Sequence, residues 1–269
     1  MNILQLTDLH LMRDPDATLK GVPTHASLVD VLQFVRQGVD DGRWNFDLVA
    51  ITGDLAHDEQ LATYQQLREL LGDWVSRCQL IPGNHDDRAF IREVFSELVQ
   101  PDSGWVTFSI EAAQWRLIGL DSHVPGEVFG RVHSDQLAWL KDELSKHATQ
   151  PTLLFIHHPP FAVHSKWLDA IGLQEPEELL EIIRSSSQIQ AVCAGHVHQP
   201  FEGSMGDVKL YTSPGTGVQF RPAEDIPIYD AVPPGFRTFT IDGDQFQTEV
   251  VRLPELKYHP GESGKDWTD

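Results

Sequence analysis

The chain has 269 residues, of which 41% are hydrophobic, and its 40 acidic and 20 basic side chains give a formal net charge of −20. This composition suits one large domain, whereas such an acidic surface disfavours nucleic-acid partners, whose binding depends on phosphate neutralisation by Lys and Arg. Two cysteines, Cys78 and Cys193, exclude a disulfide framework, and no apolar run is long enough to span a membrane. Because the basic start and apolar segment of a signal peptide are also lacking, we expect a cytoplasmic protein with no membrane partner.

The first part of the chain alternates between strand-like and helix-like patterns. Short apolar runs predict strands at residues 3–6, 47–51 and 78–81. Helix-like patterns occur at residues 27–37, 58–71 and 87–99, and Asp58 is a suitable N-cap for the second of these helices.

The rest of the chain contains more strands than helices. Strand patterns occur at residues 105–111, 115–120, 152–156, 190–194, 208–212, 237–241 and 246–252. Helix patterns occur at residues 134–146 and 176–184. This order predicts an α/β fold of two packed sheets with helices outside, within a single domain over residues 1–269. The polar, Gly- and Pro-rich tail from about residue 254 is expected to wrap the surface or to fray.

Five short polar motifs follow directly after predicted strands. In open α/β sheets, ligands bind outside the carboxyl ends of the strands, so these motifs are expected to meet at one place. Their Asp, His and Asn side chains offer the oxygen and nitrogen donors that suit Fe, Mn, Zn, Co or Ni. Each motif alone is a weak signal, but all five in this placement predict a metal site. The motifs are Thr7-Asp8-Leu9-His10, Thr52-Gly53-Asp54, Pro82-Gly83-Asn84-His85-Asp86, His157-His158-Pro159-Pro160 and Gly195-His196-Val197-His198.

The order of these motifs resembles the signature of the calcineurin-like metallophosphoesterases, D-x-H, G-D, G-N-H-D, H and G-H-x-H. The resemblance extends from residue 1 to about residue 252. It implies a four-layer αββα sandwich of two mixed sheets flanked by helices. It also implies two divalent or mixed-valence metal ions, Fe or Mn in the first place, with Zn, Co or Ni as alternatives.

The resemblance also implies which residues bind the metal ions. One ion takes Asp8, His10 and His198, the other takes Asn84, His157 and His196, and Asp54 bridges both. The neighbours His157 and His158 compete for one of these places, and His157 is assigned because it directly follows the strand and precedes x-Pro. His158 then either lines the substrate pocket or caps its loop, and both possibilities stay open.

The implied chemistry is attack on phosphorus by a metal-bridging hydroxide. A shared carboxylate holds two ions roughly 3.5–4 Å apart, and a water between them is acidified toward neutrality. His85 has no place among the ligands, so it is expected to face the phosphate and to protonate the leaving oxygen. Asp86 is expected to orient His85, and Asn84 is expected to contact the substrate as well.

Departures from other members narrow the resemblance. His57 stands where purple acid phosphatases carry a ligating Tyr, and the acidic charge disfavours the nucleases of the family. Four further segments are similar to the bacterial class III cyclic-nucleotide phosphodiesterases, which implies hydrolysis of 3′,5′-cyclic AMP or related cyclic nucleotides to the 5′-nucleotide. These segments are Leu19-Lys20-Gly21-Val22-Pro23-Thr24, Ser165-Lys166-Trp167-Leu168-Asp169, Ser213-Pro214-Gly215-Thr216-Gly217-Val218-Gln219-Phe220 and Pro234-Gly235-Phe236-Arg237.

The substrate pocket is less well defined by the sequence than the metal site. Trp167 and Phe220 are candidates to stack a purine, or they pack in the core or in the seam of a homodimer. The alternatives for function are a glycerophosphodiesterase, a broad-specificity phosphodiesterase, or a non-catalytic metal-binding regulatory protein. Gln219 and Arg237 share the substrate-related resemblance, and the other candidate pocket residues are His25, His123, Phe129 and His164.

Overall fold

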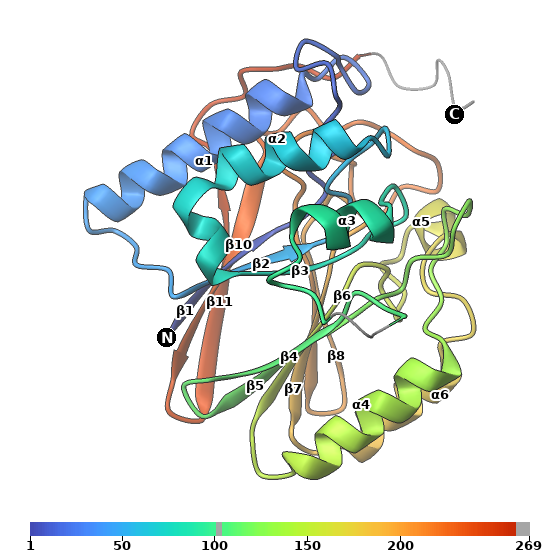
Figure 1. The fold of residues 1–269 in the computed structure, drawn as a ribbon. Helices are drawn as coiled ribbons and strands as arrows, with labels where there is room; N and C mark the ends of the chain where they lie inside the picture. The colour runs from blue at the N-terminus through green and yellow to red at the C-terminus, as the bar shows by residue number, and fades with distance from the viewer. Residues whose placement is uncertain (101–103, 262–269) are drawn as a thin grey trace.

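The computed structural model describes residues 1–100 and 104–261, and these residues form two mixed β-sheets with helices on their outer faces (Figure 1). The first sheet has the order β11-β10-β1-β2-β3 and the second has the order β4-β5-β6-β7-β9-β8. The strands of the first sheet are β1 (Asn2–Leu6), β2 (Leu48–Thr52), β3 (Cys78–Ile81), β10 (Gly235–Asp242) and β11 (Gln245–Arg252). Those of the second are β4 (Phe108–Ala112), β5 (Trp115–Leu120), β6 (Thr152–Ile156), β7 (Ile189–Ala194), β8 (Phe201–Met205) and β9 (Val208–Thr212).

Alternating side chains along the central strands explain the layers. In β1, Ile3 packs between the two sheets, whereas Leu4 and Leu6 face the helices. In β6, Leu153 packs between the sheets and Leu154 faces the opposite helices. Because both faces of these strands are covered, their sequences are almost continuously apolar. The expected arrangement of two packed mixed sheets with helices outside is thus confirmed.

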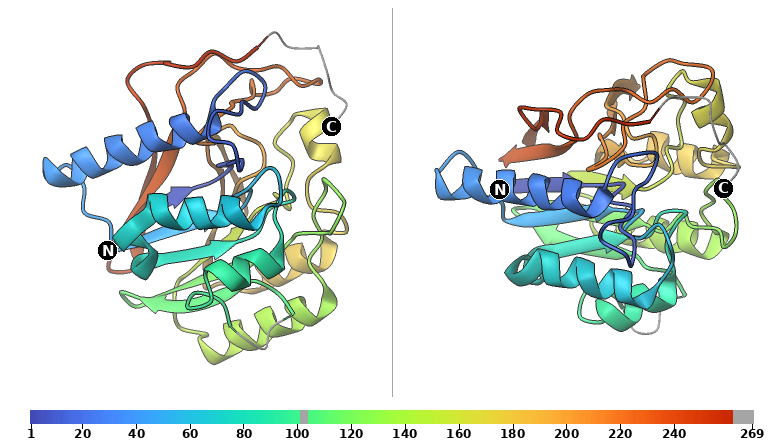
Figure 2. Two further views of the ribbon diagram at one scale, coloured as in Figure 1. Left: turned by 45° about the horizontal axis from the view of Figure 1, so that its top comes forward. Right: turned by 90° about the horizontal axis from the view of Figure 1, so that it is seen from above.

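The helices cover the outer faces of the two sheets (Figures 1 and 2). The first sheet carries α1 (Thr24–Asp40), α2 (Leu61–Leu71) and α3 (Arg88–Val94). The second sheet carries α4 (Ser134–Lys146) and α6 (Glu177–Ser185), and the short α5 (Lys166–Ala170) lies near the carboxyl ends of its strands. None of the helices in the described ranges is both long and apolar enough to cross a membrane.

Several predicted boundaries are corrected. The helix expected from Asp58 begins at Leu61, because the Asp58 carboxylate accepts hydrogen bonds from the Gln60 amide at 3.3 Å and the Thr63 hydroxyl at 2.7 Å in the preceding turn. The helix expected over 87–99 ends at Val94. The sequence analysis missed β8, an edge strand with an alternating, partly exposed pattern and an internal glycine, and it also missed α5.

The tail after β11 lies along the loop that precedes α1. The Gly261 amide donates to the Lys20 carbonyl at 2.8 Å, and the Lys257 ammonium lies 2.9 Å from an Asp30 carboxylate oxygen. Tyr258 joins an apolar cluster with Val22 and Val218. The part of the predicted tail beyond residue 261 lies outside the described residues.

Candidate metal centre and substrate pocket

The five polar motifs meet at the carboxyl ends of β1, β2, β3, β6 and β7. The first three strands run parallel in one sheet, and the last two run parallel in the other. Each strand therefore delivers the residues that follow it to the same edge of the sandwich. The side chains brought together there are Asp8, His10, Asp54, Asn84, His157, His196 and His198, all of them buried.

The first group of donors surrounds a space that fits a metal ion. His10 Nε2 lies 3.0 Å from His198 Nε2 and 3.3 Å from Asp54 Oδ2. His198 Nε2 lies 3.4 Å from Asp8 Oδ1. Bonds of about 2.0–2.1 Å to a transition metal would leave neighbouring donors about 3.0–3.4 Å apart. These four side chains therefore have the spacing of a ligand set.

A second group of donors shares Asp54 with the first. Asp54 Oδ2 lies 3.4 Å from His157 Nε2, and the Asn84 side-chain oxygen lies 3.0 Å from His196 Nδ1. His157 Nε2 is buried and has no hydrogen-bond partner among the described residues. An unpaired buried nitrogen is costly, so this atom fits a ligand to a metal ion. The donors of both groups match the nitrogen and oxygen chemistry of Fe, Mn or Zn.

Backbone carbonyls fix which ring nitrogen of two histidines faces the site. His157 Nδ1 donates to the Thr52 carbonyl at 2.7 Å, and His198 Nδ1 donates to the Val218 carbonyl at 2.9 Å. Each bond leaves the Nε2 lone pair directed toward the site, which is the usual support for a metal-binding His.

The backbone at the centre is held in unusual conformations. Left-handed φ angles are uncommon for residues other than glycine, and such strain concentrates at functional sites. They occur here at Asp8 (54°), His10 (46°), Asp54 (53°), His196 (70°) and His198 (48°).

Two motif glycines allow the strands to approach closely. A Cβ atom on Gly83 would lie 2.2 Å from Asp54 Oδ1, and one on Gly53 would lie 2.3 Å from His157 Nδ1. Any side chain at these positions would displace Asp54 or His157, so glycine is required there.

Burial and Asp54 set the protonation of the centre. Burial lowers the pKa of His196 to about 3 and holds the pKa of His10 well below its usual value. Burial also lowers the pKa of His157, but the adjacent Asp54 carboxylate more than offsets this and raises it to about 9. Since a metal binds the neutral imidazole, His157 must lose a proton when an ion binds.

Comparison with known proteins identifies the family. The sequence pattern of the calcineurin-like phosphoesterases matches residues 1–200. The chain belongs to the calcineurin-like phosphoesterase family. The resemblance expected from the five motifs is thereby confirmed.

Similar proteins cover almost the whole length of this phosphoesterase. It is 33% identical to the "3′,5′-cyclic adenosine monophosphate phosphodiesterase CpdA" of Escherichia coli K12, over 97% of this chain and 92% of that protein. It is 34% identical to a "probable cyclic nucleotide phosphodiesterase" of Synechococcus, over 91% and 89% of the two chains. A solved "dimetal phosphatase" from Danio rerio shares the fold, with a TM-score of 0.70, 15% identity and 97% of both chains covered.

Asp86 has partners other than the one expected from the sequence. Its buried carboxylate accepts hydrogen bonds from the amides of Leu55, Ala56 and Gly83 and from the Tyr64 hydroxyl, at 2.8–3.2 Å. It thus joins the loops after β2 and β3, which carry the candidate ligands Asp54 and Asn84. This set of contacts replaces the expectation that Asp86 orients His85.

His158 is anchored on both sides of its ring. Its Nε2 donates to the Val128 carbonyl at 3.1 Å, and its Nδ1 accepts from the Ser122 hydroxyl at 2.8 Å. A Cβ atom on Gly130 would lie 2.2 Å from this ring. Of the two open roles for His158, the structure places it as an anchor of the loop around residue 128 and not as a substrate contact.

A pocket opens beside the candidate metal ligands. Trp167 and Phe220 form one wall, with their rings 4.8 Å apart in an edge-to-face arrangement, and Phe220 lies 4.9 Å from the ring of His198. The sequence analysis also proposed His25, His123, Phe129 and His164, which are not among the lining residues. The lining residues are His10, Leu19, Lys20, Asp54, His57, Asn84, His85, Val128, Trp167, Leu168, Ile171, His196, His198, Val218 and Phe220.

Gln219 and Arg237 stabilise the frame of the pocket and do not line it. The fully buried Arg237 guanidinium donates to the Thr212 carbonyl at 3.1 Å and to the Thr248 hydroxyl at 3.2 Å. The Gln219 amide donates to the Gly215 carbonyl at 2.7 Å. Although both residues share the substrate-related resemblance, their contacts are with the surrounding backbone and side chains.

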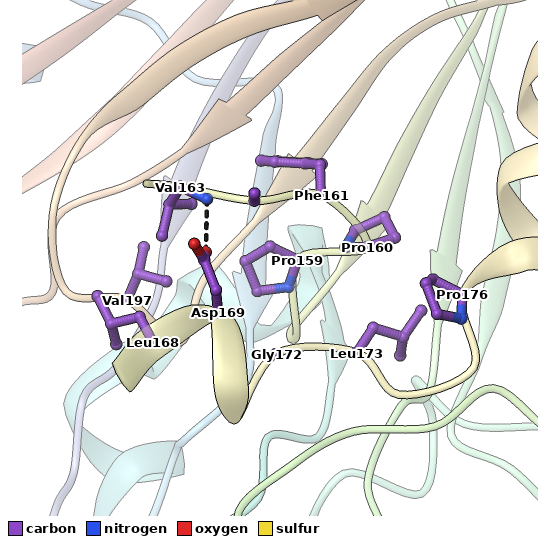
Figure 3. A pocket seen from close by; sticks show the side chains of 11 residues that line it. Pro159, Pro160, Phe161, Val163, Leu168, Asp169, Gly172, Leu173, Pro176 and Val197 are labelled. Atoms are coloured by element: carbon purple, nitrogen blue, oxygen red, sulfur yellow. Dashed lines mark hydrogen bonds between the residues drawn. The ribbon is translucent and has the colours of Figure 1, made fainter. Parts of the chain in front are cut away.

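A second, apolar hollow is lined by residues 159–163 of the loop after β6 and by residues of α5 and the loop that follows it (Figure 3). Asp169 is the one ionisable residue among those that line it, and its carboxylate accepts from the Val163 amide at 2.7 Å. This hollow therefore offers no free donor set for phosphoester chemistry.

Proposed function

We propose that the protein is a dinuclear-metal phosphodiesterase that hydrolyses 3′,5′-cyclic AMP, or a related cyclic nucleotide, to the 5′-nucleotide. One observation carries the dinuclear part: Asp54 Oδ2 lies 3.3 Å from His10 Nε2 and 3.4 Å from His157 Nε2, between the two groups of donors. The names of the similar proteins support a cyclic nucleotide as the substrate.

The proposed ligands fall into two sets that share Asp54. Asp54 would serve both ions, and Fe or Mn is the metal that the family resemblance implies in the first place. Bound there, two ions would neutralise the phosphoryl oxygens and supply an acidic water as nucleophile. One ion would be held by Asp8, His10 and His198, and the other by Asn84, His157 and His196.

His85 is the proposed general acid. Its backbone amide donates to Asp54 Oδ1 at 2.9 Å, and its half-buried ring lines the pocket 5.1 Å from the ring of His10. The side chain thus lies at the edge of the metal-binding group, and its ring nitrogens have no partner among the described residues. Asn84 has an NH₂ group besides its oxygen, which is suited to donate to a phosphoryl oxygen.

The position of His85 determines the expected product. If His85 protonates the 3′ oxygen as the bond from that oxygen to phosphorus breaks, the phosphate stays on the 5′ carbon. The product of 3′,5′-cyclic AMP is then 5′-AMP. The wall formed by Trp167 and Phe220 offers the base an aromatic surface.

Chromatography of the products tests the proposal. The Mn²⁺-loaded protein is incubated with 3′,5′-cyclic AMP, and 5′-AMP is expected. Formation of 3′-AMP would contradict the role of His85 at the 3′ oxygen. No turnover of cyclic AMP, with hydrolysis of bis-p-nitrophenyl phosphate retained, would favour a glycerophosphodiesterase or a broad-specificity phosphodiesterase.

A further inference from the structure

His57 is not among the proposed metal ligands, yet it lies in the pocket next to His10 and His85. It follows Asp54 by three residues, and its backbone amide donates to the Leu11 carbonyl at 2.7 Å. Its ring lies 4.6 Å from that of His85 with an interplanar angle of 34°, and 5.3 Å from that of His10. Two imidazoles, His57 and His85, are therefore presented side by side to a substrate.

The hydrogen bond between His10 and His57 fixes the proton positions. His10 Nε2 faces the other donors of the first group, so a neutral His10 that binds through Nε2 carries its proton on Nδ1. This Nδ1 lies 3.2 Å from His57 Nδ1, which must then accept. A neutral His57 that accepts at Nδ1 carries its own proton on Nε2.

The Nε2–H group of His57 is available to a ligand. No described residue accepts a hydrogen bond from it, and the half-buried side chain lines the pocket. The neighbouring His85 is the proposed acid for the 3′ oxygen of the ribose. The 2′-hydroxyl is on the neighbouring ribose carbon, on the same face of the ring as the 3′ oxygen. If His85 contacts the 3′ oxygen, the adjacent His57 would face the 2′-hydroxyl.

Resting on the proposed cyclic-nucleotide activity, we propose that His57 donates a hydrogen bond to the 2′-hydroxyl of the substrate and thereby selects ribonucleotides over 2′-deoxyribonucleotides. A hydrogen bond between neutral groups in a partly exposed pocket gives a preference of roughly 3- to 10-fold. The contact is made at the ribose and not at phosphorus, so it changes the selectivity without changing the reaction.

The test compares kcat/KM for 3′,5′-cyclic AMP and for its 2′-deoxy analogue in three variants. His57→Phe keeps a ring but loses the donor, and it is expected to abolish the preference by losing activity toward the ribonucleotide alone. His57→Gln keeps a donor and is expected to retain part of the preference. His133→Phe is the matched control, because the exposed His133 stacks on Trp105 outside the pocket, and it is expected to behave as the wild type.

Metal content, measured by elemental analysis of each purified variant, is the readout independent of activity. It is expected to equal that of the wild type in His57→Phe. Loss of an ion would show that His57 acts at the metal site, as a ligand or through its hydrogen bond to His10, and would overturn the proposal, as would equal losses on both substrates or an absence of preference in the wild type. Failure of the wild type to hydrolyse either cyclic nucleotide would overturn the proposed function itself and this inference with it.

Discussion

The floor and the mouth of the pocket are built in different ways. On the floor, Asp54 and His196 are at most 6% exposed and lie two residues after the strands β2 and β7. At the mouth, Lys20 and Trp167 are half-buried and belong to a loop and to the five-residue helix α5. The floor therefore has little freedom to change, whereas the mouth can vary without disturbing the sheets. This difference separates the chemistry of the site from its selectivity.

The largest effect is expected from the floor. Asp54→Ala removes the carboxylate shared by both groups of donors, so hydrolysis of bis-p-nitrophenyl phosphate should fall to the level of metal-free protein. Asp207→Ala, in the exposed turn between β8 and β9, is the matched control and should remain fully active. An Asp54→Ala variant that keeps substantial activity would show that the floor does not depend on a shared ligand.

His85 lies where the floor meets the mouth. His85→Ala should lower kcat by about 10²–10⁴, the usual contribution of a positioned acid or base, while the metal content stays unchanged. Steady-state kinetics and elemental analysis of the same sample check both parts. Stoichiometric loss of an ion would instead make His85 a ligand.

Asp86 tests how the floor is supported. Asp86→Ala leaves three buried amides and the Tyr64 hydroxyl without their acceptor, and each unsatisfied group costs on the order of 1 kcal/mol or more. Urea unfolding should therefore show a loss of about 3–5 kcal/mol in the free energy of unfolding. A loss below about 1 kcal/mol, typical of a surface substitution, would mean that these contacts contribute little.

A smaller effect is expected at the mouth. Trp167→Ala removes half of the aromatic wall, so KM for 3′,5′-cyclic AMP should rise by roughly 5- to 100-fold, in line with about 1–3 kcal/mol for stacking on a base. For bis-p-nitrophenyl phosphate, kcat and the metal content should change little. A fall in kcat for both substrates would contradict the separation of floor and mouth.

The sequence predicted the floor of the pocket because its nitrogen and oxygen donors follow shortly after strands in the sequence. Asp8, Asp54 and His196 each lie within two residues of a strand, so short motifs identify them without knowledge of the packing. The layers could be predicted for the same reason, since strands covered on both faces are apolar throughout. The weak edge strand β8 lacks that signal and was missed.

The partners of several other residues depend on long-range packing. Asp86 meets Tyr64, and Arg237 meets Thr212, only when elements from different parts of the sequence are assembled. The sequence therefore paired Asp86 with its neighbour His85, and it linked Arg237 to the substrate. Val128 reaches the pocket from a loop with no motif. The sequence shows that His57 stands where purple acid phosphatases carry a Tyr. Its position beside His10 and His85 is visible only in the fold.

The central claim is that one shared carboxylate supports two metal ions. The most direct test is elemental analysis of the wild-type protein after loading with Mn²⁺ and removal of unbound metal. The account predicts two ions per chain, bound with donors from both sheets. A value of one ion or fewer per chain in fully folded protein would contradict it.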